Sequence, residues 1–429
     1  MSDPPGREPG EAGAADPDEP GAGPGLAGEE APGVGPTTPL ATRLGFLRGA
    51  TISLITVLFA FFTAGLVMLV TGSDPLATYK AIFEGTGLQW LFPWVAGDDR
   101  TIAAINLQQT LIITTPLILT GLAVAFAFRA GLFNIGGQGQ YIVGSIVAVW
   151  VGSSLEGTPA LLHVILAVVA ACLAGALWGS IAGILKATVG AHEVISTIML
   201  NYIALWMGVW LFSLGGPLQT DKQESIPVSE DVLDSAKLPV FWGEPELQGL
   251  HIGLFIALAV LVVFWVLLNR SRVGYEVRAV GLNPEAARYS GMNVSRNYVL
   301  VMAICGLFAG LAGAIDVLGW EFRINENDVK VSNIGFLGIA VALLGRSTAL
   351  GTAAAALLFG ALVSGTSQRF LDPTIFEPEL AGNLTYVIQG LVVLLVSAEV
   401  LVLGVLRRGR GLMPGGRSSQ GAGAEVPQP

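Results

Sequence analysis

Residues 161–185 read LLHVILAVVAACLAGALWGSIAGIL, a stretch without a single charged side chain. An α-helix needs about 20 apolar residues to cross the hydrocarbon core of a bilayer. The stretch therefore predicts a membrane-spanning helix, and similar runs on both sides of it predict about ten such helices. The other runs lie at 49–70, 108–128, 134–152, 194–214, 251–269, 297–318, 334–345, 349–368 and 384–405. Because the run at 334–345 is short and interrupted by glycines, we expect a broken or re-entrant helix there.

The composition agrees with a protein that lies mostly in lipid. Of its 429 residues, 52% are hydrophobic and only 13% are charged, whereas soluble proteins carry about 25% charged residues. The sequence thus predicts an all-α, polytopic membrane protein and excludes a soluble enzyme. The net charge of −10 leaves no basic excess of the kind that binds nucleic acid.

The charges between the runs predict the orientation of the chain. With the N-terminus inside and strict alternation, the inside loops hold fourteen Lys and Arg against three acidic residues, and the outside loops hold seven against eighteen. Loops rich in Lys and Arg stay in the cytoplasm. We therefore expect both termini inside, in a multi-pass protein of the cell membrane.

Three segments divide the chain. Residues 1–42 are acidic and rich in Pro and Gly, which predicts a disordered cytoplasmic tail. Residues 43–406 form the predicted transmembrane domain, and residues 407–429 form a second cytoplasmic tail, basic and then polar.

Two predicted external loops are long enough to have structure of their own. Loop 71–107 contains Asp74-Pro75, which is typical of a helix start. Loop 215–250 is acidic, and it is either a solvated surface or a docking surface for an extracytoplasmic partner.

The chain lacks the sequence motifs that would let it hydrolyse ATP or catalyse another reaction itself. A phosphate-binding P-loop ends in Gly-Lys followed by Ser or Thr, and no glycine in this sequence precedes a lysine. We find no cluster of His, Cys, Asp or Glu at catalytic or metal-binding spacing. We therefore predict that the chain is not an enzyme and binds no metal. Either a separate subunit hydrolyses ATP or an ion gradient drives transport.

One cytoplasmic segment, residues 270–296, is built to contact a partner. Asn283 is a good N-cap, Pro284 suits the first helical position, and Glu285 complements the helix dipole. Ala286 and Ala287 then offer a flat face, and Gly291 favours a helix end. A short, stiff helix with small residues at its tip suits mechanical coupling, and we expect it to dock in a groove of a partner.

Here the sequence resembles a known family. Gly281-Leu-Asn-Pro-Glu-Ala-Ala-Arg-Tyr-Ser-Gly291 resembles the coupling loop of permeases for nucleosides and simple sugars in ATP-binding-cassette importers, which are related to permeases for branched-chain amino acids. The stretches 131–140 and 191–202 resemble the same family, and the second is similar to the larger permease of bacterial nucleoside importers. The resemblance covers residues 44–406.

The resemblance implies a set of partners. A cytoplasmic ATPase would bind the coupling residues and would hold the ATP, so that this chain itself needs no cofactor. A second permease subunit, in a heterodimer, and an extracytoplasmic substrate-binding lipoprotein would complete the importer. The implied coupling residues are Gly281, Asn283, Pro284, Glu285, Ala286, Ala287, Arg288, Tyr289 and Gly291.

Two groups of polar residues in the apolar runs are candidates for the solute pathway. The first group comprises the amides Asn134, Gln138 and Gln140, among glycines that permit a broken helix. The second recurs near helical spacing and comprises Glu193, Ser196, Thr197 and Asn201. Uncharged amides suit a small neutral polar solute. The alternative is that both groups only hold helices together.

The resemblance favours a nucleoside as the solute and leaves a simple sugar such as a pentose open. An ion-coupled secondary transporter is the rival from another class. It would need titratable groups at the middle of the bilayer, and most of the candidates here lie near helix ends.

Overall fold

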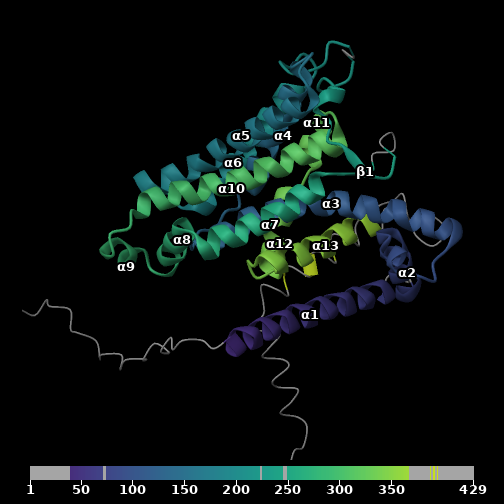
Figure 1. The fold of residues 1–429 in the computed structure, drawn as a ribbon, viewed down its shortest axis with the longest axis horizontal. Coiled ribbons are helices and arrows are strands. Elements are labelled where there is room, and N and C mark those ends of the chain that lie inside the picture. Colours follow the sequence, from purple (N-terminus) through teal and green to yellow (C-terminus); the bar gives the residue numbers. More distant parts are fainter. Residues whose placement is uncertain are drawn as a thin grey trace, which may run out of the picture. The chain divides into compact units, whose positions relative to one another are not determined.

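The computed structural model describes residues 39–70, 74–222, 225–244 and 249–366, and residues 387, 390, 391 and 394. The chain divides into two units, residues 1–47 and 48–429, and the contacts below lie within the second. Its architecture is almost entirely helical (Figure 1). The helices are α1 (Pro39–Val70), α2 (Pro75–Thr86), α3 (Gly97–Arg129), α4 (Gly137–Ser154), α5 (Ala160–Val189), α6 (Glu193–Phe212), α7 (Gly253–Arg270), α8 (Arg272–Leu282), α9 (Pro284–Tyr289), α10 (Val294–Asp316), α11 (Glu326–Val331), α12 (Ile334–Leu344) and α13 (Ala349–Gly365).

Six helical segments of the described residues are long and apolar enough to cross a membrane. They are Gly97–Arg129, Ala160–Val189, Glu193–Phe212, Gly253–Arg270, Val294–Glu321 and Glu326–Leu344. The coarser prediction, a mostly helical polytopic membrane protein, is thereby confirmed. The predicted run at 384–405, most of the first tail and the whole second tail lie outside the described residues.

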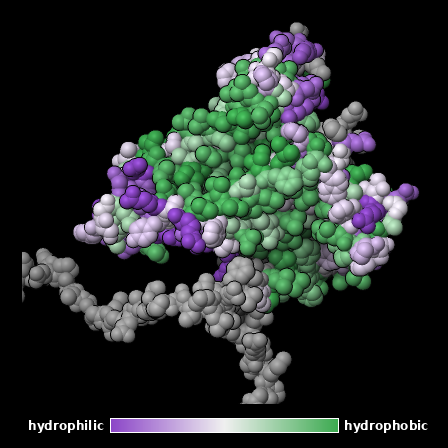
Figure 2. Space-filling model, viewed as in Figure 1, coloured by the Kyte–Doolittle hydropathy of each residue, from purple (hydrophilic) through white to green (hydrophobic). Residues whose placement is uncertain are grey.

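The surface agrees with this assignment. In the space-filling view, hydrophobic residues cover the broad middle of the visible face (Figure 2). Hydrophilic residues gather near α8 and α9 on one side and near α11 and β1 on the other. Large apolar side chains such as Leu177, Trp206 and Val262 are more than half exposed. Such a band between polar ends is what a lipid environment requires.

Several boundaries differ from the sequence prediction. Helix α3 begins at Gly97, so the last part of the predicted loop 71–107 is helical. Helix α1 begins at Pro39, inside the predicted tail 1–42. Segment 270–296 contains α8 as well as the expected short helix α9. Helices α1 and α3 continue beyond their apolar stretches into polar and charged residues, and α8 is a separate helix that carries Arg272, Glu276 and Arg278.

Other predicted features are confirmed. Helix α2 starts where Asp74 predicted, because the Asp74 carboxylate accepts from the backbone N–H of Leu76 at 2.9 Å. The run at 334–345 belongs to a broken helix, since α11 and α12 are separated by Ser332 and Asn333.

Helix α10 lies at the centre of the unit and packs on α3, α4 and α5. Its contact with α5 is a close approach of backbones through small residues. A Cβ atom placed on Gly306 would lie 2.0 Å from the carbonyl oxygen of Gly175, and one on Gly310 would lie 2.5 Å from that of Ala171. This geometry is common where membrane helices associate, because small residues allow extensive van der Waals contact.

The segment between α6 and α7 is anchored on the helices. His163 at the start of α5 is fully buried, with Nδ1 2.8 Å from the Ser235 hydroxyl and Nε2 3.0 Å from the Val151 carbonyl oxygen. Strand β1 (Val240–Trp242) pairs antiparallel with β2 (Leu250–His251). The hydrogen bond from Lys222, with another from Thr220, lowers the pKa of the Glu230 carboxyl. The predicted acidic loop 215–250 is therefore an ordered element over its described residues.

Candidate functional site

The three predicted amides are buried at the start of α4. Asn134 and Gln140 form a reciprocal pair, with the Asn134 Nδ2 3.2 Å from the Gln140 Oε1 and the Gln140 Nε2 3.3 Å from the Asn134 Oδ1. The Asn134 Oδ1 also accepts from the backbone N–H of Gly136 at 2.9 Å. These bonds fix the irregular turn that leads into α4.

Gln138 makes a different contact, which we call the Gln138 bridge. Its Nε2 donates to the carbonyl oxygen of Ser332 at 2.8 Å, and its Oε1 accepts from the backbone N–H of Gly335 at 2.8 Å. One side chain thus satisfies backbone groups on both sides of the break between α11 and α12. A Cβ on Gly335 would lie 2.3 Å from the Gln138 Cα, so the close approach requires glycine.

Replacing Gln138 with leucine is expected to destabilise the protein. The change would leave the buried Gly335 N–H and the half-buried Ser332 carbonyl without these partners, and an unpaired buried group costs about 1–3 kcal/mol. We expect the purified variant to have a lower melting temperature than wild type. The measurement is the fraction of the protein that stays monodisperse after heating to a series of temperatures. The matched control is Asn269→Leu, which removes an exposed amide whose Nδ2 donates to the Trp265 carbonyl oxygen, and it should melt like wild type. Equal melting of the two variants would contradict a bridging role.

Helix α6 contributes to the same place. The Asn201 Oδ1 accepts from the backbone N–H of Gly139 at 2.8 Å, and its Nδ2 donates to the Ile135 carbonyl at 2.9 Å. Thr197 is also buried, and a Cβ on Gly136 would lie 3.1 Å from the Thr197 Cβ. The structure therefore brings five of the seven predicted pathway residues together. They are Asn134, Gln138, Gln140, Thr197 and Asn201.

The other two predicted pathway residues lie at the first turn of α6. Glu193 forms an ion pair with Lys186 at 2.7 Å. The Ser196 hydroxyl donates to carbonyl groups of its own helix. All seven side chains have protein partners. Gln138 and Asn201 join segments that are far apart in the sequence, whereas the hydroxyls of Ser196 and Thr197 bond only within α6 and its cap. A direct contact with solute stays a prediction.

A buried polar cluster that the sequence analysis missed lies one helical turn further along α4. The Tyr141 hydroxyl donates to the Asp316 carboxylate. Asp316 is buried at the end of α10. Only the spacing between Gln138 and Tyr141 indicated that both would lie on one face of α4.

The cluster borders a small cavity. The cavity has a volume of about 20 Å³, and its lining includes Tyr141, Glu321, Asp328 and Ser332, which is room for about one water. Helix α10 continues into a π-helical turn, Val317–Glu321, which ends at Phe322 with φ of 56°. Such turns often mark functional sites, and nothing in the local sequence predicted this one.

The segment that was expected to couple to a partner has the predicted helix. The Asn283 Oδ1 accepts from the backbone N–H groups of Glu285 and Ala286, both at 3.0 Å, and Pro284 begins α9. At the other end, Gly291 has φ of 84°. The Met292 N–H donates to the Ala287 carbonyl oxygen at 3.0 Å, and the Gly291 N–H to that of Arg288 at 3.0 Å. This is a Schellman helix end.

The exposed face of α9 differs from the expected one. Ala287 is only 3% exposed, because it packs with Val280 and Val294 of the same chain. It therefore offers no contact surface to a partner, whereas Ala286 is exposed. Two large side chains beside it are almost fully exposed, Leu282 at 89% and Tyr289 at 93%. We call residues 282–289 the α9 tip.

The α9 tip is connected to the buried amides by a close backbone contact. A Cβ on Gly281 would lie 2.6 Å from the Arg129 carbonyl oxygen, and one on Gly131 would lie 2.9 Å from the Gly281 carbonyl oxygen. Gly131 stands three residues before Asn134. The backbone at the end of α8 therefore lies against the turn that leads to Asn134.

Within the described residues, no group of three or more His, Cys, Asp or Glu is placed to hold a metal ion.

Comparison with known proteins gives consistent results. Residues 106–397 match the family described as branched-chain amino acid transport system / permease component. The chain is 43% identical to the guanosine ABC transporter permease protein NupP of Bacillus subtilis, over 73% of this chain and 84% of that protein. It is 32% identical to the nucleoside ABC transporter permease protein NupB of Lactococcus lactis, over 83% of this chain and 93% of that protein. It is 33% identical to the glucose ABC transporter permease protein TsgB13 of Haloferax volcanii, over 80% of this chain and 86% of that protein.

Proposed function

We propose that this chain is the membrane-spanning subunit of an ATP-binding-cassette importer for nucleosides. The premise is that the chain belongs to the family of branched-chain amino acid transport system permease components. The observation that carries the nucleoside assignment is the 43% identity to a guanosine permease over 84% of its length. Membership in this family removes the ion-coupled transporter from consideration. A simple sugar remains the second candidate solute, because a glucose permease is 33% identical.

Solute uptake tests this assignment directly. A strain that lacks the gene would be given radiolabelled guanosine, ribose and glucose, each with and without the gene restored. We expect the restored gene to recover uptake of guanosine and not of the two sugars. Uptake of a sugar without uptake of guanosine would replace the nucleoside with a sugar and leave the permease assignment intact.

The α9 tip is the proposed contact with a separate cytoplasmic ATPase, which would hold the ATP. What supports this is the exposure of Leu282, the last residue of α8, and of Tyr289 in α9, a short helix with both ends capped. Large exposed apolar side chains in water mark interaction surfaces. A second permease subunit in a heterodimer and an extracytoplasmic substrate-binding lipoprotein would complete the importer.

The proposed orientation has about ten membrane helices and both termini in the cytoplasm. It puts Glu276 of α8 inside and Asp234, between α6 and α7, outside. A cysteine at Asp234 is expected to react with an impermeant maleimide in intact cells, and a cysteine at Glu276 only after the cells are opened. Both side chains are exposed, and neither Asp234 nor Glu276 caps a helix. The reverse pattern would invert the orientation.

A further inference from the structure

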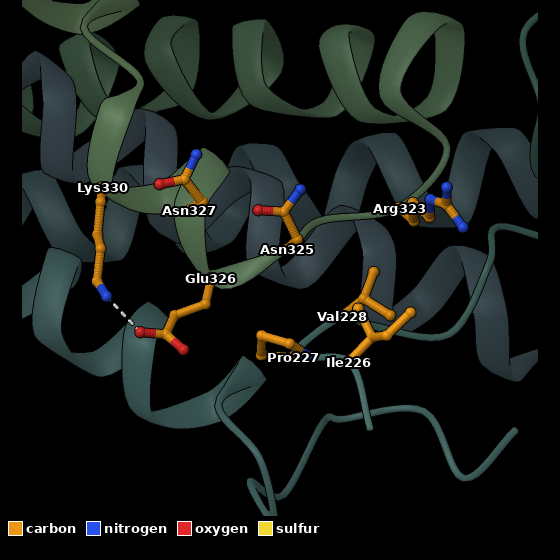
Figure 3. A pocket seen from close by; sticks show the side chains of 8 residues that line it. All are labelled: Ile226, Pro227, Val228, Arg323, Asn325, Glu326, Asn327 and Lys330. Carbon is orange, nitrogen blue, oxygen red and sulfur yellow. Dashed lines mark hydrogen bonds and ion pairs between the residues drawn. The ribbon is translucent and has the colours of Figure 1, made fainter. Parts of the chain in front are cut away.

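A pocket lies at the end of the unit opposite the α9 tip. It has a volume of about 450 Å³, within the range of about 300–1,000 Å³ that is common for small-molecule sites. Figure 3 shows two walls from segments far apart in the sequence. One wall is Ile226–Val228, and the other comes from the chain between Arg323 and Lys330. In the proposed orientation the pocket faces the outside of the cell.

Backbone contacts hold the two walls together. The Ser229 N–H donates to the Ile324 carbonyl oxygen at 2.9 Å, and the Ser229 hydroxyl accepts from the Ile324 N–H at 3.0 Å. The Glu326 N–H donates to the Pro227 carbonyl oxygen at 3.0 Å. The pocket is therefore a built feature between two ordered segments, not a gap between independent loops.

The lining of the pocket suits an uncharged polar ligand. Lys330 forms an ion pair with Glu326, and Arg323 lies 3.9 Å from Asp231. Since each cation has an acidic partner, the pocket offers no unbalanced charge to an anion. The side chains of Ile226, Pro227 and Val228 give it an apolar wall, and Asn327 adds an exposed amide. An apolar wall opposite the side-chain amide of Asn327 suits a flat base and its polar edge.

Helix α11 separates this pocket from the interior. Glu326, Asn327 and Lys330 line the pocket, and Asp328, Val329 and Ser332 line the small inner cavity beside Tyr141. One helix of six residues thus forms the floor of the pocket and a wall of the inner cavity. The end of the same segment, Ser332, is held by the Gln138 bridge. The pocket therefore stands directly in line with the buried polar groups.

We propose that the pocket between Ile226–Val228 and Arg323–Lys330 is an external subsite where the nucleoside binds before it passes α11. This inference rests on the proposed function and deepens it. It assigns a first binding position to this chain itself, separate from whatever the substrate-binding lipoprotein holds. The floor of the subsite, α11, must move for the solute to continue inward.

Protection from chemical labelling tests the subsite in the complete importer. Cys172 and Cys305, the two native cysteines, are replaced with serine, and a cysteine is introduced by Asn327→Cys. The matched control is Asp234→Cys, an exposed residue outside the pocket. Labelling by an impermeant maleimide is measured in cells with and without the lipoprotein, at increasing guanosine. At about ten times the Kd, labelling of the pocket cysteine should slow about tenfold, because mass action leaves about a tenth of the sites open.

Each outcome decides the proposal. Protection at position 327 and none at 234, with or without the lipoprotein, supports a nucleoside subsite. Protection only when the lipoprotein is present would show that the pocket receives a segment of that protein, and it would overturn the subsite. Unchanged labelling in cells that take up guanosine normally would overturn the subsite and leave the proposed function standing. Absence of guanosine uptake by the wild-type importer would instead overturn the proposed function.

Discussion

A protein in which Leu282 and Tyr289 are both replaced by aspartate is expected to reach the membrane at the normal level and to import no solute. The two side chains are 89% and 93% exposed, so they contribute little to the stability of the chain itself. If they fill a groove of the ATPase, two buried carboxylates without partners would cost several kcal/mol. Copurification of the ATPase and uptake of labelled guanosine should both be lost. Copurification of the ATPase is measured by affinity capture of the permease.

Two comparisons make this result specific. Val189→Asp places the same charge on a residue that is 73% exposed at the end of α5, and it should leave uptake normal. Ala287→Glu should act differently, because Ala287 is buried against Val280 and Val294. We expect it to lower the amount of folded protein. Normal copurification with the double aspartate variant would contradict the assignment of the α9 tip.

Replacing Gly306 with valine is expected to prevent the protein from accumulating. Its Cβ would lie 2.0 Å from the Gly175 carbonyl oxygen, and backbone atoms of two packed helices cannot move aside as a flexible side chain could. Overpacking typically costs about 1–3 kcal/mol and sometimes more, and here it acts on the contact between α5 and α10. The amount of monodisperse protein after detergent extraction measures the effect. The control is the neighbouring change Leu307→Val, at a side chain 37% exposed, which should leave the amount of monodisperse protein unchanged. Equal yields of the Gly306→Val and Leu307→Val proteins would contradict the packing argument.

The apolar runs were enough to predict the class of the fold, because each helix that crosses lipid must carry its own apolar length. They were not enough to locate the helix ends. Helix α3 starts at Gly97 with Asp98 and Asp99 in its first turn, and these charges made the start look like a loop. Helix α8 was missed because it lies beside the membrane domain and carries charged residues. Only tertiary contacts such as that of Gly281 with Gly131 reveal its position.

The site was predicted in part. Local signals identified α9 correctly, since Asn283, Pro284 and Gly291 act on backbone groups within a few residues. They could not show that Ala287 packs on Val294, because that contact depends on how the chain returns into α10. Gln138 was recognised as unusual, but its partners Ser332 and Gly335 lie 194 and 197 residues further along the chain. The pocket at α11 depends on two segments that no sequence pattern connects.

The Gln138 bridge has a consequence for how the importer responds to the energy state of the membrane. The amide that holds Ser332 and Gly335 carries no net charge, so releasing the bridge moves no charge through the electric field of the bilayer. A group with one elementary charge would gain or lose about 2.3 kcal/mol per 100 mV if it crossed that field. Breaking these two hydrogen bonds therefore adds no voltage dependence of its own to the helix break. Any voltage dependence would have to come from charged side chains that move with α11, such as Glu326, Asp328 and Lys330.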